Sequence, residues 1–405
     1  MINEIGEQEG YTGPLVHFFT RLPGHGDVLW EPVEHEVNVN PAITVNRNFD
    51  DRDYYVIEFR TGAVWGEVAL ENFIPADFLK RLQNGDKDAI LILSNSHEGY
   101  TGVLEYIYKG VVLQYNIPPK NIILVTGAFS IQPLNEAKAK EHDVDTINIE
   151  IGMDFELATQ EHLQYQIEDV EVDFPETLVD KQYTHSFLNL NRRWRMHRPL
   201  FVALMVAHGL IDRGLVSFGP SDDNRDWHET WLEIENLMRD YPLDFEYLSA
   251  YKHKIINMPP RYIDTDELVT NRARMEGTEG PMYANTYFSL VSETHYFEYQ
   301  PEHSVFFSEK VFKPIAFKHP FILIAPPFSL AALKSLGYKT FPGLIDESYD
   351  TEKNDIKRML KILEETRRLD SLNGAELSDW LAQAKEICEY NYTLLRTKDT
   401  WFHEF

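Results

Sequence analysis

Four arginines gather in one short segment of an acidic chain. They lie within 191–199 (NRRWRMHRP), between an expected strand and an expected helix, and are Arg192, Arg193, Arg195 and Arg198. Guanidinium groups offer forked N–H donors that match phosphate oxygens, and a helix N-terminus adds free N–H groups and partial positive charge. The segment therefore favours a phosphate-binding turn. The alternative is a solvent-exposed turn whose arginines pair with surface carboxylates.

The start of the helix expected over 309–317 carries two further cations. Ser308 has the side chain of an N-cap, and Glu309 follows it in the first turn. Lys310 and Lys313 are three positions apart, so they can share one face of the helix. Capped amphipathic helices with lysines are common, and this segment alone does not define a binding site.

Metal-binding patterns are present but weak. The triplets 143–145 (DVD) and 264–266 (DTD) each give Asp-x-Asp, whose carboxylate oxygens suit Mg²⁺ or Mn²⁺. In a chain this acidic such triplets arise by chance, so no metal site is predicted. The single cysteine, Cys388, excludes an intramolecular disulfide and a zinc site built from cysteines.

The composition disfavours several classes of function. With 65 acidic and 38 basic residues the formal charge is −27, which repels phosphate backbones and disfavours bulk nucleic-acid binding. No apolar run approaches the roughly 20 residues that span a bilayer, so no membrane span is expected. The N-terminus is acidic and polar, unlike a signal peptide, and the cysteine content fits a reducing compartment. A cytoplasmic protein is therefore expected.

Strand-like and helix-like segments alternate along the chain. In the first half, strands are expected at 54–59, 89–93, 121–125 and 146–151, with helices at 76–83 and 102–115. In the second half, strands are expected at 185–190, 215–218, 287–292 and 321–325, with helices at 199–213, 309–317, 330–336, 355–369 and 374–392. This rhythm indicates two α/β units with parallel sheets. The acidic, proline-containing segment 167–180 is the expected connection, and a ligand is expected in a cleft between the units.

The second half also carries an ordered set of motifs. An aromatic-rich strand leads to Glu293, the triplet Ser308-Glu309-Lys310 begins a helix, and an apolar strand follows at 320–325. Upstream, Arg198 precedes a helix and the strand within 214–219. In this order, the tract 185–350 resembles the nucleotide-binding domain of alpha-1,3-fucosyltransferase-like enzymes. It is also similar to a group of phage-encoded proteins assigned as glycosyltransferases.

The resemblance implies an α/β fold of two Rossmann-like domains facing a cleft, the GT-B type. Its domains would be 1–175 on the acceptor side, 181–380 for the nucleotide-sugar donor, and a helical tail at 381–405. It makes Arg198 and Lys310 partners of the donor pyrophosphate, Glu293 a contact to the sugar or ribose, and Glu309 a ribose or helix-start contact. Donor-binding residues would also include Arg192, Arg193, Arg195, Thr294, Ser308 and Lys313.

A departing nucleoside diphosphate gains negative charge in the transition state, and fixed cations and helix N–H groups lower that barrier. Because Arg and Lys can supply this charge, neither a metal nor any cofactor beyond the nucleotide-sugar co-substrate is expected.

The acceptor must lose a proton as the new bond forms, so a general base is wanted. The apolar run 89–93 leads into the loop 94–100 (SNSHEGY), at the carboxyl end of a buried strand, where α/β sheets place functional groups. Glu98 and His97 are the candidate bases, and Glu98 is preferred because the similar enzymes use an acidic residue in this domain. A polar turn that caps the next helix explains the same residues equally well.

An acidic loop follows the short strand expected at 338–341. Asp346 and Glu347, with Tyr349 beside them, could hold sugar hydroxyls or balance the arginines of 192–198. The alternative is an acidic surface loop. The similarity to the phage-encoded proteins extends over this segment and favours a place in the cleft.

These features indicate an enzyme, a metal-independent glycosyltransferase that moves a sugar from a nucleotide-sugar donor to an unidentified hydroxyl acceptor. The acceptor would be a carbohydrate or a modified base. One alternative is a phage enzyme that glycosylates hydroxymethylated bases in DNA, acting in the host cytoplasm. The other is a non-catalytic binding protein that keeps the GT-B fold, which the presence of Arg198, Glu293 and Lys310 disfavours.

Overall fold

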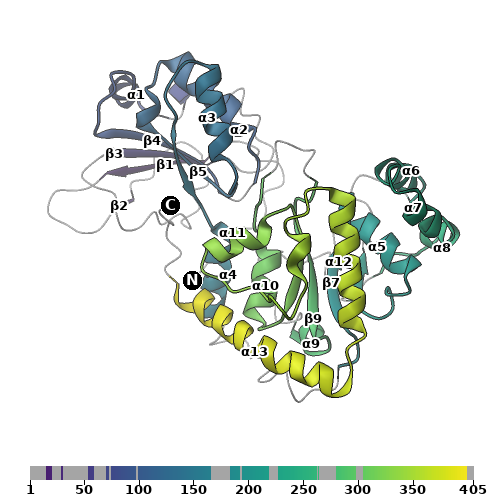
Figure 1. The fold of residues 1–405 in the computed structure, drawn as a ribbon. Helices are drawn as coiled ribbons and strands as arrows, with labels where there is room; N and C mark the ends of the chain where they lie inside the picture. Colours follow the sequence, from purple (N-terminus) through teal and green to yellow (C-terminus); the bar gives the residue numbers. More distant parts are fainter. Residues whose placement is uncertain are drawn as a thin grey trace. The chain divides into compact units, whose positions relative to one another are not determined.

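The computed structural model describes residues 15–20, 29–30, 53–58, 70–72, 74–96, 99–165, 183–191, 194–218, 227–261, 263, 280–297 and 304–398. The described residues up to Asp154, together with Ser304, form one compact unit, and the remaining described residues form a second. Each unit has its own sheet and its own helices (Figure 1). The expected connection at 167–180 lies outside the described residues.

The sheet of the first unit has six strands in the order β2-β1-β3-β4-β5-β6. Four of them run parallel, and these are β3 (Asp53–Glu58), β4 (Ala89–Asn95), β5 (Ile122–Thr126) and β6 (Asn148–Ile151). β1 (Leu15–Thr20) pairs antiparallel with β3 and with β2 (Leu29–Trp30), and sequence analysis predicts neither β1 nor β2. All seven residues of β4 are buried, which explains its continuous apolar run.

The helices of the first unit are α1 (Ala76–Gln83), α2 (Val103–Tyr106) and α3 (Gln132–Glu141), with short 3₁₀ turns at Leu70–Asn72 and Pro119–Asn121. The single helix expected over 102–115 is interrupted, because α2 continues into a π-helix at Ile107–Leu113. The helices bury their apolar side chains against β3, β4 and β5, and the core includes Leu91, Leu93, Leu104, Ile107 and Leu124. α4 (Asp154–Tyr165) begins where this unit ends.

The sheet of the second unit has four parallel strands in the order β10-β9-β7-β8. They are β7 (Phe187–Asn191), β8 (Leu215–Phe218), β9 (Phe288–Ser292) and β10 (Phe321–Ile324). The helices around them are α5 (His197–Ala207), α6 (Trp227–Leu237), α7 (Pro242–Ser249), α8 (Lys252–Ile256), α9 (Gly280–Ala284), α10 (Glu309–Ala316), α11 (Ser329–Ser335), α12 (Asp355–Asp370) and α13 (Gly374–Thr397), with a 3₁₀ turn at Glu347–Tyr349.

The architecture is therefore mixed α/β, with four parallel strands in each of two sheets, as two Rossmann-like domains would have. Three expectations differ. The helix expected to reach residue 213 ends at Ala207, where Gly209 turns the chain with a φ of 71°. The segment 338–341 is no strand, and only a bridge between Pro342 and Ile345 follows it. Sequence analysis also does not predict α3, α4, α6, α7, α8 and α9. Of these, α7 and α8 pack against α5, and α6 packs against α8 (Figure 1).

No helix in the described ranges combines the length and the apolar character that a membrane crossing needs.

A buried ion pair anchors the end of α13 in the second unit. The Glu156 carboxylate at the start of α4 is fully buried, and its Oε1 lies 2.7 Å from Lys398 Nζ. The Tyr338 hydroxyl donates to the same oxygen at 2.6 Å. Gln160 adds a hydrogen bond of 2.6 Å from its side-chain amide to the Lys398 carbonyl. The residue that follows α13 is therefore attached to α4 through the Glu156 carboxylate and the Gln160 amide.

Removing the cation should leave this carboxylate charged and buried. We expect Lys398→Met to lower the free energy of unfolding by about 3–5 kcal/mol, measured by urea denaturation. Lys109→Met, which removes an exposed partner of Glu105, is the control and should cost far less. Adding Glu156→Gln to Lys398→Met should restore part of the loss. An equal loss of unfolding free energy in Lys398→Met and Lys109→Met would show that the buried pair stabilises the fold no more than the exposed one.

Candidate functional site

Buried polar side chains gather at the carboxyl ends of the strands in the second unit. Asn189 and Asn191 lie in β7, Ser217 in β8 and Ser292 in β9, and Glu293 follows β9 directly. All five are at most 3% exposed. Parallel sheets bind ligands at this edge. Burying a polar group costs free energy unless it is hydrogen-bonded, so a buried polar cluster here is a candidate ligand site. This cluster is the strongest candidate site in the described part of the chain.

The Asn side chains form a hydrogen-bonded row across the sheet. The Asn189 amide donates to the Leu290 carbonyl at 2.6 Å and to Ser292 Oγ at 3.3 Å. The Asn191 amide donates to Asn189 Oδ1, and the Asn191 backbone N–H donates to Ser217 Oγ at 3.1 Å. Asn191 Oδ1 is buried and has no hydrogen-bond partner among the described residues. One acceptor at the end of this row is therefore left for a donor.

Glu293 lies at the centre of the cluster. Its Oε2 accepts hydrogen bonds from Ser308 Oγ at 2.6 Å and from the Thr294 backbone N–H at 3.2 Å. Its Oε1 is buried and, within the described ranges, has no hydrogen-bond partner. Burial raises the pKa of the Glu293 carboxyl to about 7, against the opposing effect of the Lys310 charge and the Ser308 hydrogen bond. Near neutral pH the carboxyl is therefore about half protonated.

The N-terminus of α10 places a cation beside this carboxyl. Ser308 caps the helix by accepting the Lys310 backbone N–H at 3.3 Å. Lys310 Nζ donates to Ser308 Oγ at 3.1 Å and to Glu309 Oε1 at 2.8 Å. Burial alone would raise the pKa of Glu309, but the charges of Lys310 and Lys313 and the Lys310 hydrogen bond hold it below its ordinary value. The triplet therefore forms one charged unit, and the Lys310 side chain remains 27% exposed.

The N-terminus of α5 holds the backbone of the same loop. Arg198 Nη2 donates to the carbonyls of Ser292 and Glu293 at 3.1 and 3.3 Å. His197 Nε2 lies 3.0 Å from the Glu293 carbonyl, and it must be the donor because a carbonyl only accepts. Burial, with the charge of Arg198, holds the pKa of His197 well below its ordinary value, so the ring is neutral. Arg195 is partly buried and adds to this effect.

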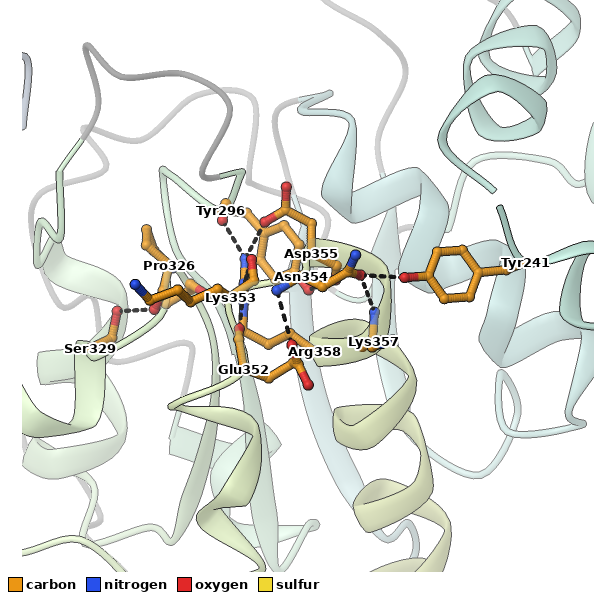
Figure 2. A network of polar contacts seen from close by, with 11 residues as sticks. Tyr241, Tyr296, Pro326, Ser329, Glu352, Lys353, Asn354, Asp355, Lys357 and Arg358 are labelled. Atoms are coloured by element: carbon orange, nitrogen blue, oxygen red, sulfur yellow. Dashed lines mark hydrogen bonds and ion pairs between the residues drawn. The ribbon is translucent and has the colours of Figure 1, made fainter. Parts of the chain in front are cut away.

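Arg358 of α12 is the centre of a polar network that includes Tyr296 and Asp355 (Figure 2). This buried guanidinium donates to the Tyr296 carbonyl at 2.6 Å and to the Ala325 carbonyl at 3.1 Å. It also lies 4.4 Å from the centre of the Tyr296 ring, which in turn stacks on His197 with ring centres 5.4 Å apart. Asp355 Oδ1 accepts a further bond at 2.7 Å. The loops after β9 and β10 are therefore joined through one side chain of α12.

The predicted residues thus have different positions. The structure brings Arg198, Glu293, Thr294, Ser308 and Lys310 together, with Glu309 and Lys313 beside Lys310. Arg192, Arg193, His97 and Glu98 lie outside the described residues. Sequence analysis missed Asn189, Asn191, His197, Tyr296 and Arg358. The Asn-x-Asn spacing in a strand could have indicated the first two, because alternate residues share one face.

The acidic loop has contacts of its own. The Glu347 carboxylate accepts from the Phe341 N–H at 2.6 Å and from Thr340 Oγ1 at 2.9 Å. The Asp346 carboxylate accepts from the Ser348 N–H at 3.0 Å, and the hydroxyl of Tyr349 accepts from the Leu323 N–H at 3.3 Å. These bonds shape the turn before α12 and attach it to β10. The predicted sugar contacts of Asp346, Glu347 and Tyr349 stay predictions.

In the first unit, polar residues also end the central strand. Ser94, Asn95 and Ser96 are buried at the carboxyl end of β4. Ser96 Oγ donates to Asp154 Oδ2 at 2.6 Å, and the Asn95 amide donates to the Tyr100 carbonyl at 3.3 Å. Asn95 Oδ1 is buried and, in the part of the chain that the structure describes, has no hydrogen-bond partner. Among the described residues that directly precede His97 and Glu98, one buried acceptor, Asn95 Oδ1, is therefore left for a donor.

One group of side chains in the first unit could offer metal ligands. Single ligand atoms of Glu105, Glu141 and His142 lie within 4.8 Å of one another. Hydrogen bonds from Lys109 and Lys138 lower the pKa of Glu105 to about 2, so the carboxylate is already paired with two cations. A metal ion would have to displace these ammonium groups. The Asp-x-Asp at 143–145 follows α3 closely, and that at 264–266 lies outside the described residues.

No protein-family model, curated protein or solved structure matches this chain. The chemistry of the site is therefore inferred from its own residues.

The raised pKa of Glu293 should appear in the pH dependence of stability. Between its ordinary pKa of 4.5 and about 7, the folded state holds a proton that the unfolded state releases. Stability then falls as pH rises through this window and levels off above it. We expect urea denaturation to show a fall between pH 5 and 8 that is smaller in Glu293→Gln, by on the order of 2 kcal/mol.

Glu309→Gln is the matched control, because the pKa of Glu309 is lowered and its titration lies below this window. It should leave the fall between pH 5 and 8 as in the wild type. An identical fall in Glu293→Gln and wild type would mean that the buried carboxyl titrates normally.

Proposed function

We propose that this protein is a glycosyltransferase of the GT-B type that takes its sugar from a nucleotide-sugar donor. The observation that carries the proposal is the fully buried Glu293, whose Oε1 lacks a partner among the described residues while Lys310 lies beside the same carboxyl. Sugar and ribose hydroxyls are the donors that such an acceptor needs, and a diphosphate is the anion that suits the lysine.

Within this proposal the parts of the site have distinct roles. Lys310, still partly exposed, contacts the donor pyrophosphate, and Glu293 and Asn191 accept hydrogen bonds from donor hydroxyls. Arg198 is 3% exposed and bonds to backbone carbonyls, so it acts chiefly as a positioning residue for the Glu293 loop. The arginines before α5 add positive charge for the phosphates. Fixed positive charge of this kind stabilises the departing nucleoside diphosphate.

The acceptor side is proposed to lie in the first unit, at the carboxyl end of β4. There Glu98, or else His97, takes the proton of the acceptor hydroxyl as the glycosidic bond forms. The proton leaves the hydroxyl, the acceptor oxygen bonds to the anomeric carbon, and the nucleoside diphosphate departs with the bonding electrons.

The proposal is tested by nucleotide binding. A thermal-shift screen with UDP, GDP, CMP and dTDP, in buffer containing EDTA, should raise the unfolding midpoint with at least one of them, because a ligand of the native state stabilises it. A flat response to all four at millimolar concentration would contradict the proposal. If the unfolding midpoint rises only when Mg²⁺ or Mn²⁺ replaces EDTA, a metal ion and not Lys310 neutralises the phosphates of the nucleotide.

Lys310 should discriminate between phosphorylated and unphosphorylated ligands. We expect Lys310→Ala to weaken binding of the nucleoside diphosphate found in the screen by about 1.5–3 kcal/mol, the range for a charge-assisted hydrogen bond. The matching nucleoside should bind as before, as measured by calorimetry. Lys252→Ala, an exposed lysine of α8 above the Trp231 ring, is the control and should change neither. Equal loss for both ligands would place Lys310 at the base or ribose.

A further inference from the structure

One aromatic residue in the second unit is held in an unfavourable backbone conformation and yet reaches solvent. Phe328, just before α11, has φ 67° and ψ 14°, the left-handed region. A bulky residue rarely adopts this region, because its Cβ crowds the following carbonyl. Its side chain remains 44% exposed, so burial of the ring does not compensate for the strain. Such an outlier suggests a functional reason.

The surroundings fix this conformation firmly. The Phe328 backbone N–H donates to the Asp350 carbonyl at 2.7 Å. The Asp350 carboxylate accepts from the next turn, from the N–H groups of Leu330 at 2.8 Å and Ala331 at 3.3 Å. Ser329 Oγ donates to the Pro326 carbonyl at 2.7 Å, which Figure 2 shows. The ring is therefore presented by a rigid turn.

The turn lies at the same sheet edge as the Glu293 cluster. β10 ends at Ile324, whose carbonyl accepts the Glu293 N–H at 3.0 Å, and Phe328 follows four residues later. Arg358 joins the two loops by donating to the carbonyls of Tyr296 and Ala325. Lys353 Nζ lies 5.9 Å from the centre of the Phe328 ring. An exposed ring on the loop after β10 and a cation on the loop before α12 thus lie close together at this edge.

We propose that Phe328 is the stacking platform for the nucleobase of the donor, with the Lys353 ammonium close to the ring. The inference rests on the proposed function, because it assumes that the Glu293 cluster takes the sugar and phosphates of a nucleotide. Any base presents a π-face that an aromatic ring can stack on, whatever its hydrogen-bonding pattern. The strained turn keeps the ring in place before the ligand arrives, which reduces the entropy lost on binding.

The test compares ligands with and without a base. Phe328→Gly removes the ring and also relieves the left-handed strain, so the variant should fold at least as well as the wild type. We expect its affinity for GDP and UDP, measured by calorimetry, to fall about 5–100-fold, while its affinity for inorganic pyrophosphate stays unchanged. Phe328→Trp should retain nucleotide binding.

Tyr390 on α13 offers a matched control. It is 41% exposed, and Lys339 Nζ lies 4.0 Å from its ring centre, so it has the same pairing without the strained turn. Tyr390→Ala should leave all three affinities unchanged. Unchanged GDP and UDP affinity in Phe328→Gly, or an equal loss for pyrophosphate, would overturn the platform while the proposed function stands. A wild type that binds neither nucleotide nor pyrophosphate would overturn both.

Discussion

The second unit is organised around the burial of one carboxyl group. Glu293 is fully buried at the end of β9, and its Oε2 is satisfied by Ser308 and its own neighbouring N–H. A buried carboxylate is costly unless it is paired. The Lys310 ammonium lies nearby, and burial still raises the pKa of the Glu293 carboxyl. The strand end, the cap of α10 and its first lysine therefore depend on one another. This dependence gives a short Ser-Glu-Lys triplet a defined geometry.

A second chain of contacts keeps the backbone of that carboxyl in place. Arg358 on α12 holds Tyr296, whose ring stacks on His197, and His197 donates to the Glu293 carbonyl. These residues are far apart in the sequence, and each makes its contact through a buried polar atom or an aromatic face. Such contacts are strong only where water is excluded and every donor is used. The conformation of the loop after β9 thus rests on α5 and α12, two helices that also contact each other.

Sequence analysis predicts the parallel strands well where they are buried on both faces and read as apolar runs. β4 and β10 are predicted within two residues of their ends. β1 is missed because His17 interrupts its apolar run, and the edge strand β2 is missed because it has only two residues. Arg358 is missed because α12 carries several charged residues, and nothing in their spacing marks the one that is fully buried. The order of the motifs indicates that Ser308 and Lys310 lie near Glu293. It cannot indicate that Glu293 Oε1 is buried without a partner among the described residues, because that depends on atomic packing.

The two cations that motif order treats alike, Arg198 and Lys310, are placed differently by the structure. Arg198 is 3% exposed and donates to two backbone carbonyls, a task suited to the several N–H groups of a rigid guanidinium. Lys310 is on a flexible stem, 27% of its side chain is exposed, and its present partners are side-chain oxygens within α10 and its cap. Lys310 can therefore turn toward an anion at small cost. Binding an anion to Arg198 Nη2 would instead break its hydrogen bonds to the Ser292 and Glu293 carbonyls. The sequence motif groups them by charge, whereas burial separates Arg198, which holds backbone carbonyls, from Lys310, which the proposed function assigns to the donor phosphates.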